Sequence, residues 1–243
     1  MLTWFWRGFL IWYAVGIVLL ALGLVPPALE WANAVFLYWA GLIGAVYMVK
    51  RFGRAKGAAL SLSIIIWSIA LESFGEKTGL IFGRYQYEEG FGFKVFGVPM
   101  TIGFAWLTVI STGLALISPQ HKPRRMMYPV LSAFLAVAMD LVIDPVAFHL
   151  KNYWTWEEGG PFLDIPTQNF VGWFANALII HLILYFSIGN EEKTDPVHER
   201  RARVLYVLII LMFAVTAVVG GIGVAAVVSL ALMAVTLFVA RYV

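Results

Sequence analysis

The feature that most constrains this chain is a series of apolar stretches, each long enough to cross a lipid bilayer. The hydrocarbon core is about 30 Å thick, so a spanning helix needs roughly 20 apolar residues. A helix satisfies its own backbone hydrogen bonds in lipid, which an irregular chain cannot do. We therefore predict an all-α polytopic membrane protein, with a single integral membrane domain over residues 1–243 and about eight transmembrane helices. The predicted helices cover approximately residues 5–25, 31–49, 58–76, 99–117, 126–148, 168–188, 204–220 and 222–240.

The last two predicted helices come from one apolar stretch that is too long for a single span. Gly220-Gly221-Ile222-Gly223 favours a tight hairpin at its middle. A single tilted helix would instead give seven spans and would move the C-terminus to the other side of the membrane.

The composition agrees with a membrane protein and excludes several other classes. Of the 243 residues, 61% are hydrophobic and 13% are charged, and the mean hydropathy is +0.84. A soluble domain is nearer half apolar and a quarter charged. The chain has no cysteine, which excludes disulfides and thiolate metal sites. The net charge of +3 does not indicate nucleic-acid binding, because the bases lie in short loops between apolar runs.

Basic residues in alternate loops predict the orientation in the membrane. The positive-inside rule places these loops, together with both termini, on the cytoplasmic side of the cell membrane. The bases are Lys50, Arg51, Arg54 and Lys56, then Lys122, Arg124 and Arg125, then Lys193, Arg200, Arg201 and Arg203. The loops of the opposite side are acidic, with Glu88, Glu89, Glu157, Glu158 and Asp164.

A constellation of residues on this opposite side occurs twice. The first copy has Glu72, Glu76, Tyr85-Gln86-Tyr87-Glu88-Glu89-Gly90, Val98-Pro99 and Trp106. The second has Asp140, Asp144, Trp154-Thr155-Trp156-Glu157-Glu158-Gly159, Ile165-Pro166 and Trp173. This matched spacing predicts an internal duplication, with units at about residues 58–117 and 126–188. The units have parallel topology, so we expect a pseudo-twofold axis along the membrane normal.

Each copy carries two acids that are four residues apart and therefore share one helical face. They are Glu72 with Glu76, and Asp140 with Asp144. An ionised carboxylate in hydrocarbon costs roughly 3 kcal/mol even on the mildest scale, so we expect these acids to face the bundle interior. Close carboxyls share a proton, and a carboxyl that stays protonated near neutral pH can act as a general acid. The alternative is that they only bond one another or the backbone at a helix end.

Aromatic side chains form the second element of the predicted site. Aromatic faces stabilise cations by roughly 2 kcal/mol when the cation is desolvated, so several around one cavity could hold a carbocation. An interfacial aromatic belt is the alternative explanation. The aromatics are Tyr85, Tyr87, Trp106, Trp154, Trp156 and Trp173. Asn169, which follows the second Pro, could orient a water or an acid, or could cap a helix.

The chain offers no motif for a metal or an organic cofactor. No His/Asp/Glu spacing suggests a zinc site, and there is no glycine-rich phosphate loop or nucleophile elbow. We therefore predict that the protein uses no metal and no organic cofactor.

The segments Glu72–Trp106 and Asp140–Trp173 resemble the membrane carotenoid hydratases of the CruF type, a family that includes the bacterioruberin-pathway hydratase. The residues that carry the resemblance are Glu76, Gly79, Gly83-Arg84-Tyr85-Gln86-Tyr87, Gly97-Val98-Pro99, Asp140, Asp144-Pro145-Val146-Ala147, Trp154-Thr155-Trp156, Ile165-Pro166 and Asn169-Phe170-Val171-Gly172-Trp173. The family tends to have a glycine before the Ile-Pro, where this chain has Asp164. Heterodimer-type lycopene cyclases are similar in their arrangement of helices, acids and aromatics.

The resemblance implies a hydro-lyase that adds water to the terminal C1–C2 double bond of an acyclic carotenoid. An acid protonates C2, a tertiary cation forms at C1, and water captures it. We assign the proton donor to Asp140 or Glu72, with Asp144 and Glu76 holding the shared proton or activating water. Asn169 positions that water and the aromatics stabilise the cation. The expected partners are a long apolar polyene and the bilayer, with contacts to other enzymes of the same pathway as a further expectation.

Three alternatives remain open at the sequence level. A carotenoid cyclase would share the protonation step but capture the cation with an internal alkene. A prenyl-transfer enzyme would use Asp140 and Asp144 to bind magnesium diphosphate, although the acids face away from the cytoplasm. A proton-coupled transporter also suits parallel repeats with buried acids.

Overall fold

Eight α-helices account for most of the residues that the computed structural model describes, which are residues 2–88, 92–117, 122–188 and 195–242. Glu89 and Gly90 of the first repeated unit and Lys193 of the third basic group lie outside the described residues. The helices are α1 (Leu2–Ala21), α2 (Trp31–Phe52), α3 (Arg54–Thr78), α4 (Met100–Leu116), α5 (Lys122–Pro145), α6 (Thr167–Ser187), α7 (Pro196–Val219) and α8 (Val224–Tyr242). A 3-10 turn, η1 (Pro27–Leu29), precedes α2, and a π-helical segment, η2 (Val146–Leu150), continues α5.

The predicted all-α membrane fold is confirmed. Seven of the helices are long and apolar enough to cross a membrane, and α4 is a shorter apolar helix of 17 residues. The hairpin expected at Gly220–Gly223 separates α7 from α8, and Gly221 adopts a φ of 80° there. The alternative of seven helices is therefore wrong for the described chain.

The start of α7 differs from the prediction by two turns. We expected a helix from residue 204, but α7 begins at Pro196. Asp195 caps it by accepting hydrogen bonds from the backbone of Val197 and His198 at 3.2 Å each, and a proline suits the first helical position. Arg200, Arg201 and Arg203 therefore lie in a helix rather than in a loop.

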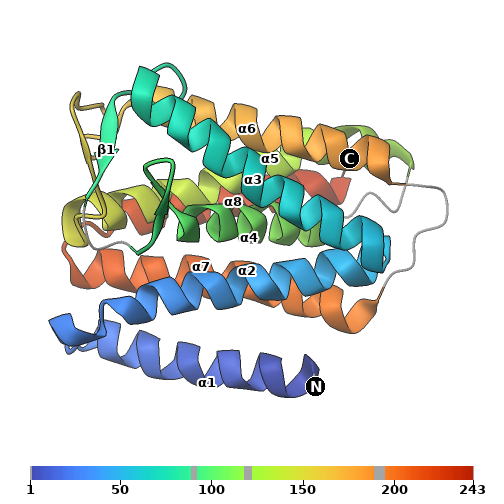
Figure 1. The fold of residues 1–243 in the computed structure, drawn as a ribbon, viewed down its shortest axis with the longest axis horizontal. Helices are drawn as coiled ribbons and strands as arrows, with labels where there is room; N and C mark the ends of the chain where they lie inside the picture. Colours follow the sequence, from blue (N-terminus) through green and yellow to red (C-terminus); the bar gives the residue numbers. More distant parts are fainter. Residues whose placement is uncertain (1, 89–91, 118–121, 189–194, 243) are drawn as a thin grey trace.

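Two short strand pairs form the end of the bundle opposite the chain termini (Figure 1). Strand β1 (Tyr85–Tyr87) pairs antiparallel with β4 (Trp154–Trp156), which joins the two copies of the repeated motif. Strand β2 (Lys94–Val95) forms a hairpin with β3 (Val98–Pro99) through Phe96 and Gly97. Both turn residues have positive φ, at 52° and 92°, as the tight hairpin turns that follow strand twist require.

Helix α4 is the most buried element of the bundle. Most of its side chains are buried, and it contacts α2, α3, α5 and α7. Helix α5 packs against α6 and α8. Helix α1 lies at the edge of the bundle (Figure 1), where it contacts α2 and α7. The central position of α4 carries Trp106 into the interior.

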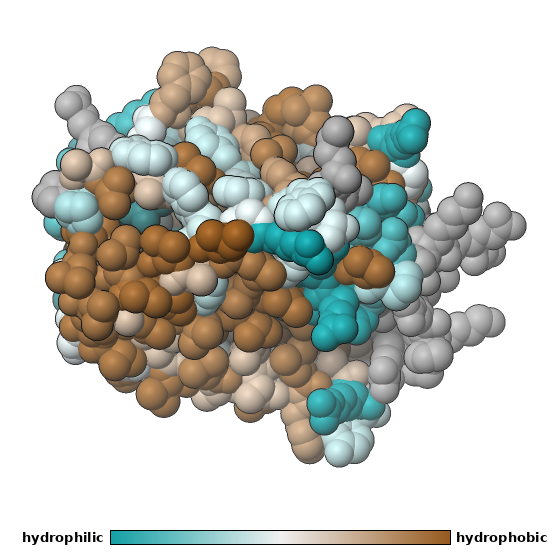
Figure 2. All heavy atoms as spheres, turned by 90° about the horizontal axis from the view of Figure 1, so that it is seen from below, coloured by the Kyte–Doolittle hydropathy of each residue, from teal (hydrophilic) through white to brown (hydrophobic). Residues whose placement is uncertain are grey.

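The surface has the polarity of a membrane protein. Large apolar side chains are exposed along the helices, among them Ile11, Ile66, Phe186, Val227 and Phe238. Figure 2 shows one face covered by hydrophobic residues over most of its length, with hydrophilic residues gathered at one end. The chain is a multi-pass membrane protein.

The end of α2 and the starts of α3 and α7, which carry Lys50, Lys56 and Arg200, lie at the end of the bundle that holds both termini (Figure 1). Lys50 at the end of α2 lies 4.0 Å from Asp195 before α7. Lys56 at the start of α3 donates to the carbonyl of Ser187 at the end of α6. This clustering agrees with the loop pattern that predicts a cytoplasmic face, and the side of the membrane stays a prediction.

Candidate active site

Glu72 lies inside the bundle and receives three hydrogen bonds. It is on α3, and 5% of its surface is exposed. Tyr85 and Tyr87 donate to its Oε2 at 2.5 Å and 2.9 Å. Trp106 of α4 donates from Nε1 to its Oε1 at 2.9 Å. Both tyrosines reach the same carboxyl because alternate residues of β1 point to one face.

The partners of Glu72 suit a negative charge. An indole N–H can only donate, so Oε1 serves as an acceptor, and both phenols can donate to Oε2. Burial, together with the charge of Glu72, raises the pKa of Tyr85 and Tyr87 well above their usual value, so both keep their protons. Charge-assisted bonds of this type are about twice as strong as neutral ones. Glu72 is therefore held in place as an acceptor.

A second acidic group combines Asp140 and Asp144 of α5 with Asn169 of α6. The side-chain amide of Asn169 donates from Nδ2 to Oδ2 of Asp140 at 2.9 Å and to Oδ2 of Asp144 at 2.5 Å. Both aspartates are buried, and their side chains interact directly. Within the described chain, Oδ1 of Asp140 has no hydrogen-bond partner. Two buried carboxyls in contact retain a proton between them, because two adjacent charges in a low dielectric repel strongly.

Asn169 has its place because α6 begins directly after the Ile-Pro turn. Pro166 is the N-cap residue of α6, with no side-chain hydrogen bond to the helix. The backbone N–H of Asn169 donates to the carbonyl of Pro166 at 2.9 Å. Its side chain is therefore not used as a helix cap and holds the two aspartates instead.

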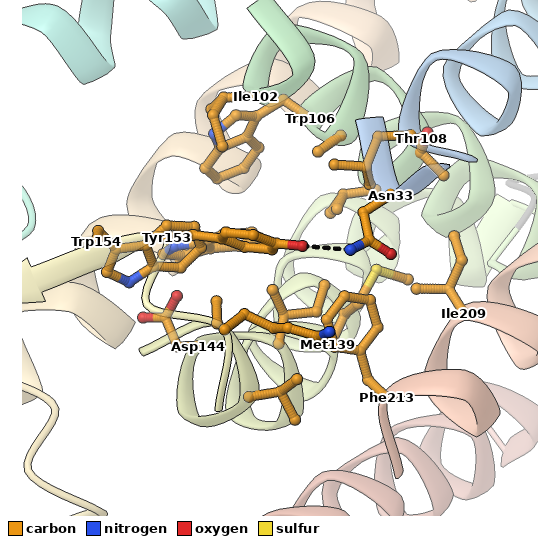
Figure 3. A pocket seen from close by; sticks show the side chains of 18 of the residues that line it. Asn33, Ile102, Trp106, Thr108, Met139, Asp144, Tyr153, Trp154, Ile209 and Phe213 are labelled. Atoms are coloured by element: carbon orange, nitrogen blue, oxygen red, sulfur yellow. Dashed lines mark hydrogen bonds between the residues drawn. The ribbon is translucent and has the colours of Figure 1, made fainter. Parts of the chain in front are cut away.

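A cavity of about 110 Å³ connects the two acidic groups. Glu72, Asp144 and Asn169 contribute to its wall, whereas Asp140 lies behind Asp144 and does not line it. Figure 3 shows Asp144 and Trp106 on the same cavity, with the Tyr153 ring between them. The wall is otherwise mostly apolar and includes Phe36, Ile102, Met139 and Phe213.

All six predicted aromatics line this cavity. Trp106 and Trp173 stack with a centroid distance of 4.3 Å and an interplanar angle of 28°. The ring centroids of Tyr85 and Trp156 are 5.1 Å apart, and the Tyr87 ring lies edge-on to Trp154 with a centroid distance of 6.0 Å. These last two contacts cross between β1 and β4, so the strands form an aromatic cover over the acids.

Glu76 is the predicted site residue that the structure places apart from the others. It is half-buried and does not line the cavity. Its carboxyl packs against Gly97 in the β2–β3 turn, so that a Cβ on that glycine would lie 2.8 Å from Oε2 of Glu76. One helical turn separates Glu76 from Glu72, and this turn moves it from the cavity to the hairpin.

Sequence reasoning missed the part of the cavity wall that α2 and α7 provide. Asn33 of α2 and Met212 and Phe213 of α7 line it, and so does Tyr153, directly before β4. The side-chain amide of Asn33 bonds the Tyr153 hydroxyl at 2.6 Å (Figure 3). An asparagine early in an otherwise apolar helix was the available signal, because such a residue must find a partner.

The comparisons with known proteins place the chain in a family. A family model described as carotenoid biosynthesis protein matches residues 32–236. The chain belongs to this carotenoid biosynthesis protein family. No curated protein and no solved structure matches the chain.

The family match includes every residue of the two acidic groups and the aromatic cover. It begins within α2 and ends within α8, so only α1 among the helices lies wholly outside it. The role of the protein therefore lies in carotenoid biosynthesis. A mostly apolar cavity in a bundle with exposed apolar helices is consistent with a polyene substrate that resides in lipid.

Proposed function

We propose that this carotenoid biosynthesis protein is a hydratase that adds water across the terminal C1–C2 double bond of an acyclic carotenoid. A single observation supports the proposal best: one member of an aspartate pair and a separate carboxyl that accepts three hydrogen bonds line one aromatic cavity. An alkene hydration needs a proton donor, a stabilised carbocation and one water. Each requirement has its own group of side chains in this cavity.

Asp144 is the proton donor in this proposal, and Asp140 is its partner. The sequence assigns the donor to Asp140 or Glu72 and gives Asp144 the shared proton. We exchange the roles of the two aspartates because, of the two, only Asp144 lines the cavity. The Asp144 carboxyl gives its proton to C2, which breaks the double bond and leaves a tertiary cation at C1. Water oxygen then bonds C1, and the proton that water loses returns to the aspartate pair. Atoms and charge balance without a redox step.

Glu72 and the aromatic cover stabilise the cation. Glu72 is held as an acceptor by Tyr85, Tyr87 and Trp106, so its negative charge is preorganised before the reaction. The stacked pair of Trp106 and Trp173 offers indole faces, which attract cations more strongly than other aromatic rings. Neither an indole nor a neutral phenol, which keeps its proton, reacts with a tertiary cation as readily as water does.

The size of the cavity is compatible with hydration. A cavity needs about 10–15 Å³ to admit one water, and this one has about 110 Å³. The cavity by itself can therefore hold water, which hydration requires. A cyclase needs the opposite, because any water near the cation competes with the internal alkene.

Expression of the chain in a lycopene-accumulating host tests the proposal. The pigments are extracted and analysed by mass: hydration adds one water per reacted end, and cyclisation adds nothing. We expect Asp144→Asn to lower the yield of hydrated pigment by about 100-fold or more, as the loss of a general acid does. Glu158→Gln makes the same acid-to-amide change at an exposed loop position and should leave the yield unchanged.

Two results would contradict the proposal. Products of unchanged mass with a ring in place of the open end would assign the cyclase reaction to the cavity. Hydrated pigment from Asp144→Asn at the wild-type level, with equal membrane insertion, would remove the donor.

A further inference from the structure

A polar cluster that the proposed mechanism does not use borders the cavity on the side of α2. It consists of Glu30, Asn33, Lys151 and Tyr153, and we call it the polar inlet. Asn33, Lys151 and Tyr153 line the cavity, each of them half-buried. Glu30 is the exposed member, with 44% of its side-chain surface accessible. The cluster thus reaches from the cavity to the surface.

Hydrogen bonds join the members of the polar inlet into one chain. Asn33 Nδ2 donates to the Tyr153 hydroxyl at 2.6 Å and to Oε2 of Glu30 at 2.9 Å. Lys151 Nζ lies 3.3 Å from Oε1 of Glu30. Two of these three contacts join residues about 120 positions apart in the chain, so the cluster ties the start of α2 to the segment after η2.

The backbone after η2 holds Tyr153 toward the cavity. The N–H of Lys151 donates to the carbonyl of Val146, and that of Tyr153 donates to the carbonyl of Ala147, both at 3.0 Å. Asn152 between them has a φ of 50°, a conformation that asparagine tolerates better than most residues. Tyr153 therefore projects between Trp106 and Met139 in Figure 3.

The other hydroxyl groups in this part of the wall are engaged within their own helices. Thr108 donates to the carbonyl of Phe104 at 2.8 Å, and Thr216 donates to the carbonyl of Met212 at 2.9 Å. The rings of β1 and β4 also line the cavity, with Tyr85, Tyr87 and Trp154 buried and Trp156 half-buried. A water molecule that crosses this wall needs polar partners on its way, and the polar inlet supplies them.

We propose that Glu30, Asn33, Lys151 and Tyr153 form the path by which the co-substrate water reaches the cavity. The inference rests on the proposed hydratase, which consumes one water per turnover beside an otherwise mostly apolar wall. Asn33 and Tyr153 are positioning residues: they pass water to the site and touch neither acid. They also determine specificity, because the supply of water decides whether the cation is hydrated.

A pair of nearly isosteric variants tests the polar inlet. Asn33→Val removes the polar group, and Asn33→Thr restores a hydroxyl in the same shape, so both share the same cost in helix propensity. Tyr153→Phe removes one hydroxyl and keeps the ring. Loss of a polar partner is worth about a fivefold change in an equilibrium or rate. Two independent measurements follow, one on access to the cavity and one on the products.

Access is measured by thiol labelling, since the natural chain has no cysteine. Thr108→Cys places a single thiol on the cavity wall, and a charged, water-soluble methanethiosulfonate reagent is added to membranes. We expect Asn33→Val to slow labelling about fivefold or more, and Asn33→Thr to leave it close to the parent. Equal labelling rates in Asn33→Val and Asn33→Thr would overturn the polar inlet. This measurement does not depend on whether the protein is a hydratase.

The products are measured with the natural Thr108 in the lycopene-accumulating host. We expect Asn33→Val and Tyr153→Phe to lower the ratio of hydrated to water-free rearranged products about fivefold, while Asn33→Thr retains the ratio. An equal loss of all products would indicate a structural role and would overturn the inlet. If the parent forms no hydrated pigment, the hydratase itself fails, and the labelling result still decides whether the polar inlet admits water.

Discussion

At the residue scale, the chemistry depends on which hydrogen bonds each buried carboxyl receives. Glu72 accepts from three donors, whereas Asp140 and Asp144 share the two N–H groups of one amide and contact one another. The first arrangement favours a carboxylate, and the second retains a proton. Two acidic groups in one cavity thus take different roles because their neighbours differ.

Glu72→Gln tests the assigned role of the carboxylate. Glutamine fits the same space and can accept from Trp106 and donate to the phenols, so we expect normal insertion. The lost charge should lower the rate of hydrated pigment formation about 100-fold, as the loss of one preorganised stabilising group does. Glu76→Gln makes the same change one turn along α3, outside the cavity, and should stay within about twofold of the parent. Equal loss in both variants would contradict the separate roles.

The backbone at Asp164 explains why a glycine would suit this position, where the chain departs from the family pattern that it resembles. Its φ is 57°, and that of Leu163 is 49°. This left-handed region favours glycine, which is the residue that the resemblance leads one to expect at position 164. Aspartate is among the few other residues that tolerate it.

Asp164→Gly should therefore raise the stability of the protein. We expect a gain of about 0.5–1 kcal/mol in the free energy of unfolding, because relief of backbone strain exceeds the added entropy of the unfolded chain. Thermal unfolding in detergent measures the change. Asp164→Ala is the matched variant and should lower stability, since it keeps the Cβ and loses the tolerant side chain. A lower unfolding temperature for Asp164→Gly than for Asp164→Ala would refute this explanation.

At the scale of elements, the β1–β4 pair decides how the two repeated motifs meet. Its register sets Tyr85 opposite Trp156 and Tyr87 opposite Trp154, so rings from both motifs cover the acids together. The loop after β4 returns closely to the Ile-Pro turn before α6. A Cβ on Gly160 would lie 1.8 Å from the carbonyl oxygen of Ile165. This distance is too short for any residue with a side chain.

Gly160→Ala should disrupt this loop, and Gly159→Ala should not. A Cβ on Gly159 meets no atom closer than 3.9 Å, so the neighbouring glycine is an internal control. We expect Gly160→Ala to cost roughly 3 kcal/mol or more of stability, because backbone must move to admit the methyl group. Thermal unfolding and the yield of hydrated pigment measure the two variants. Similar behaviour of both would indicate that the loop has room.

At the scale of the whole molecule, the two ends of the bundle have different chemistry. Both termini and the helix ends that carry Lys50 and Lys56 lie at one end, and the strands lie at the other (Figure 1). The strands carry the aromatic cover, and Tyr85 and Tyr87 hold Glu72 at this second end. The positive-inside rule assigns the basic end to the cytoplasm. Under the proposed function, the polyene then enters the cavity from the opposite half of the bilayer, and water enters from the non-cytoplasmic side.

Reporter fusions test this orientation. A fluorescent protein that folds only in the cytoplasm, fused after Val243, should fluoresce, and a fusion truncated after Thr78 should remain dark. Alkaline phosphatase at the same two positions should give the reverse pattern. Active phosphatase at the C-terminus would show that the protein has the opposite orientation in the membrane, and the fold would be unaffected.

The sequence by itself determined the helices and the residue types of the site. Long apolar runs in lipid have few alternatives to a helix, and the hairpin glycines separated α7 from α8. It also indicated Glu72, Asp140, Asp144 and Asn169, because polar groups in apolar helices need partners.

Only the tertiary structure decided which of these groups share the cavity. Asp144 lines it while Asp140 lies behind, Glu76 turns to a hairpin, and Asn33 meets Tyr153 from a distant helix. The physical reason is that helical periodicity specifies a face, whereas helix packing and strand register specify what that face meets. Contacts between residues more than one hundred positions apart leave little local signal in the chain.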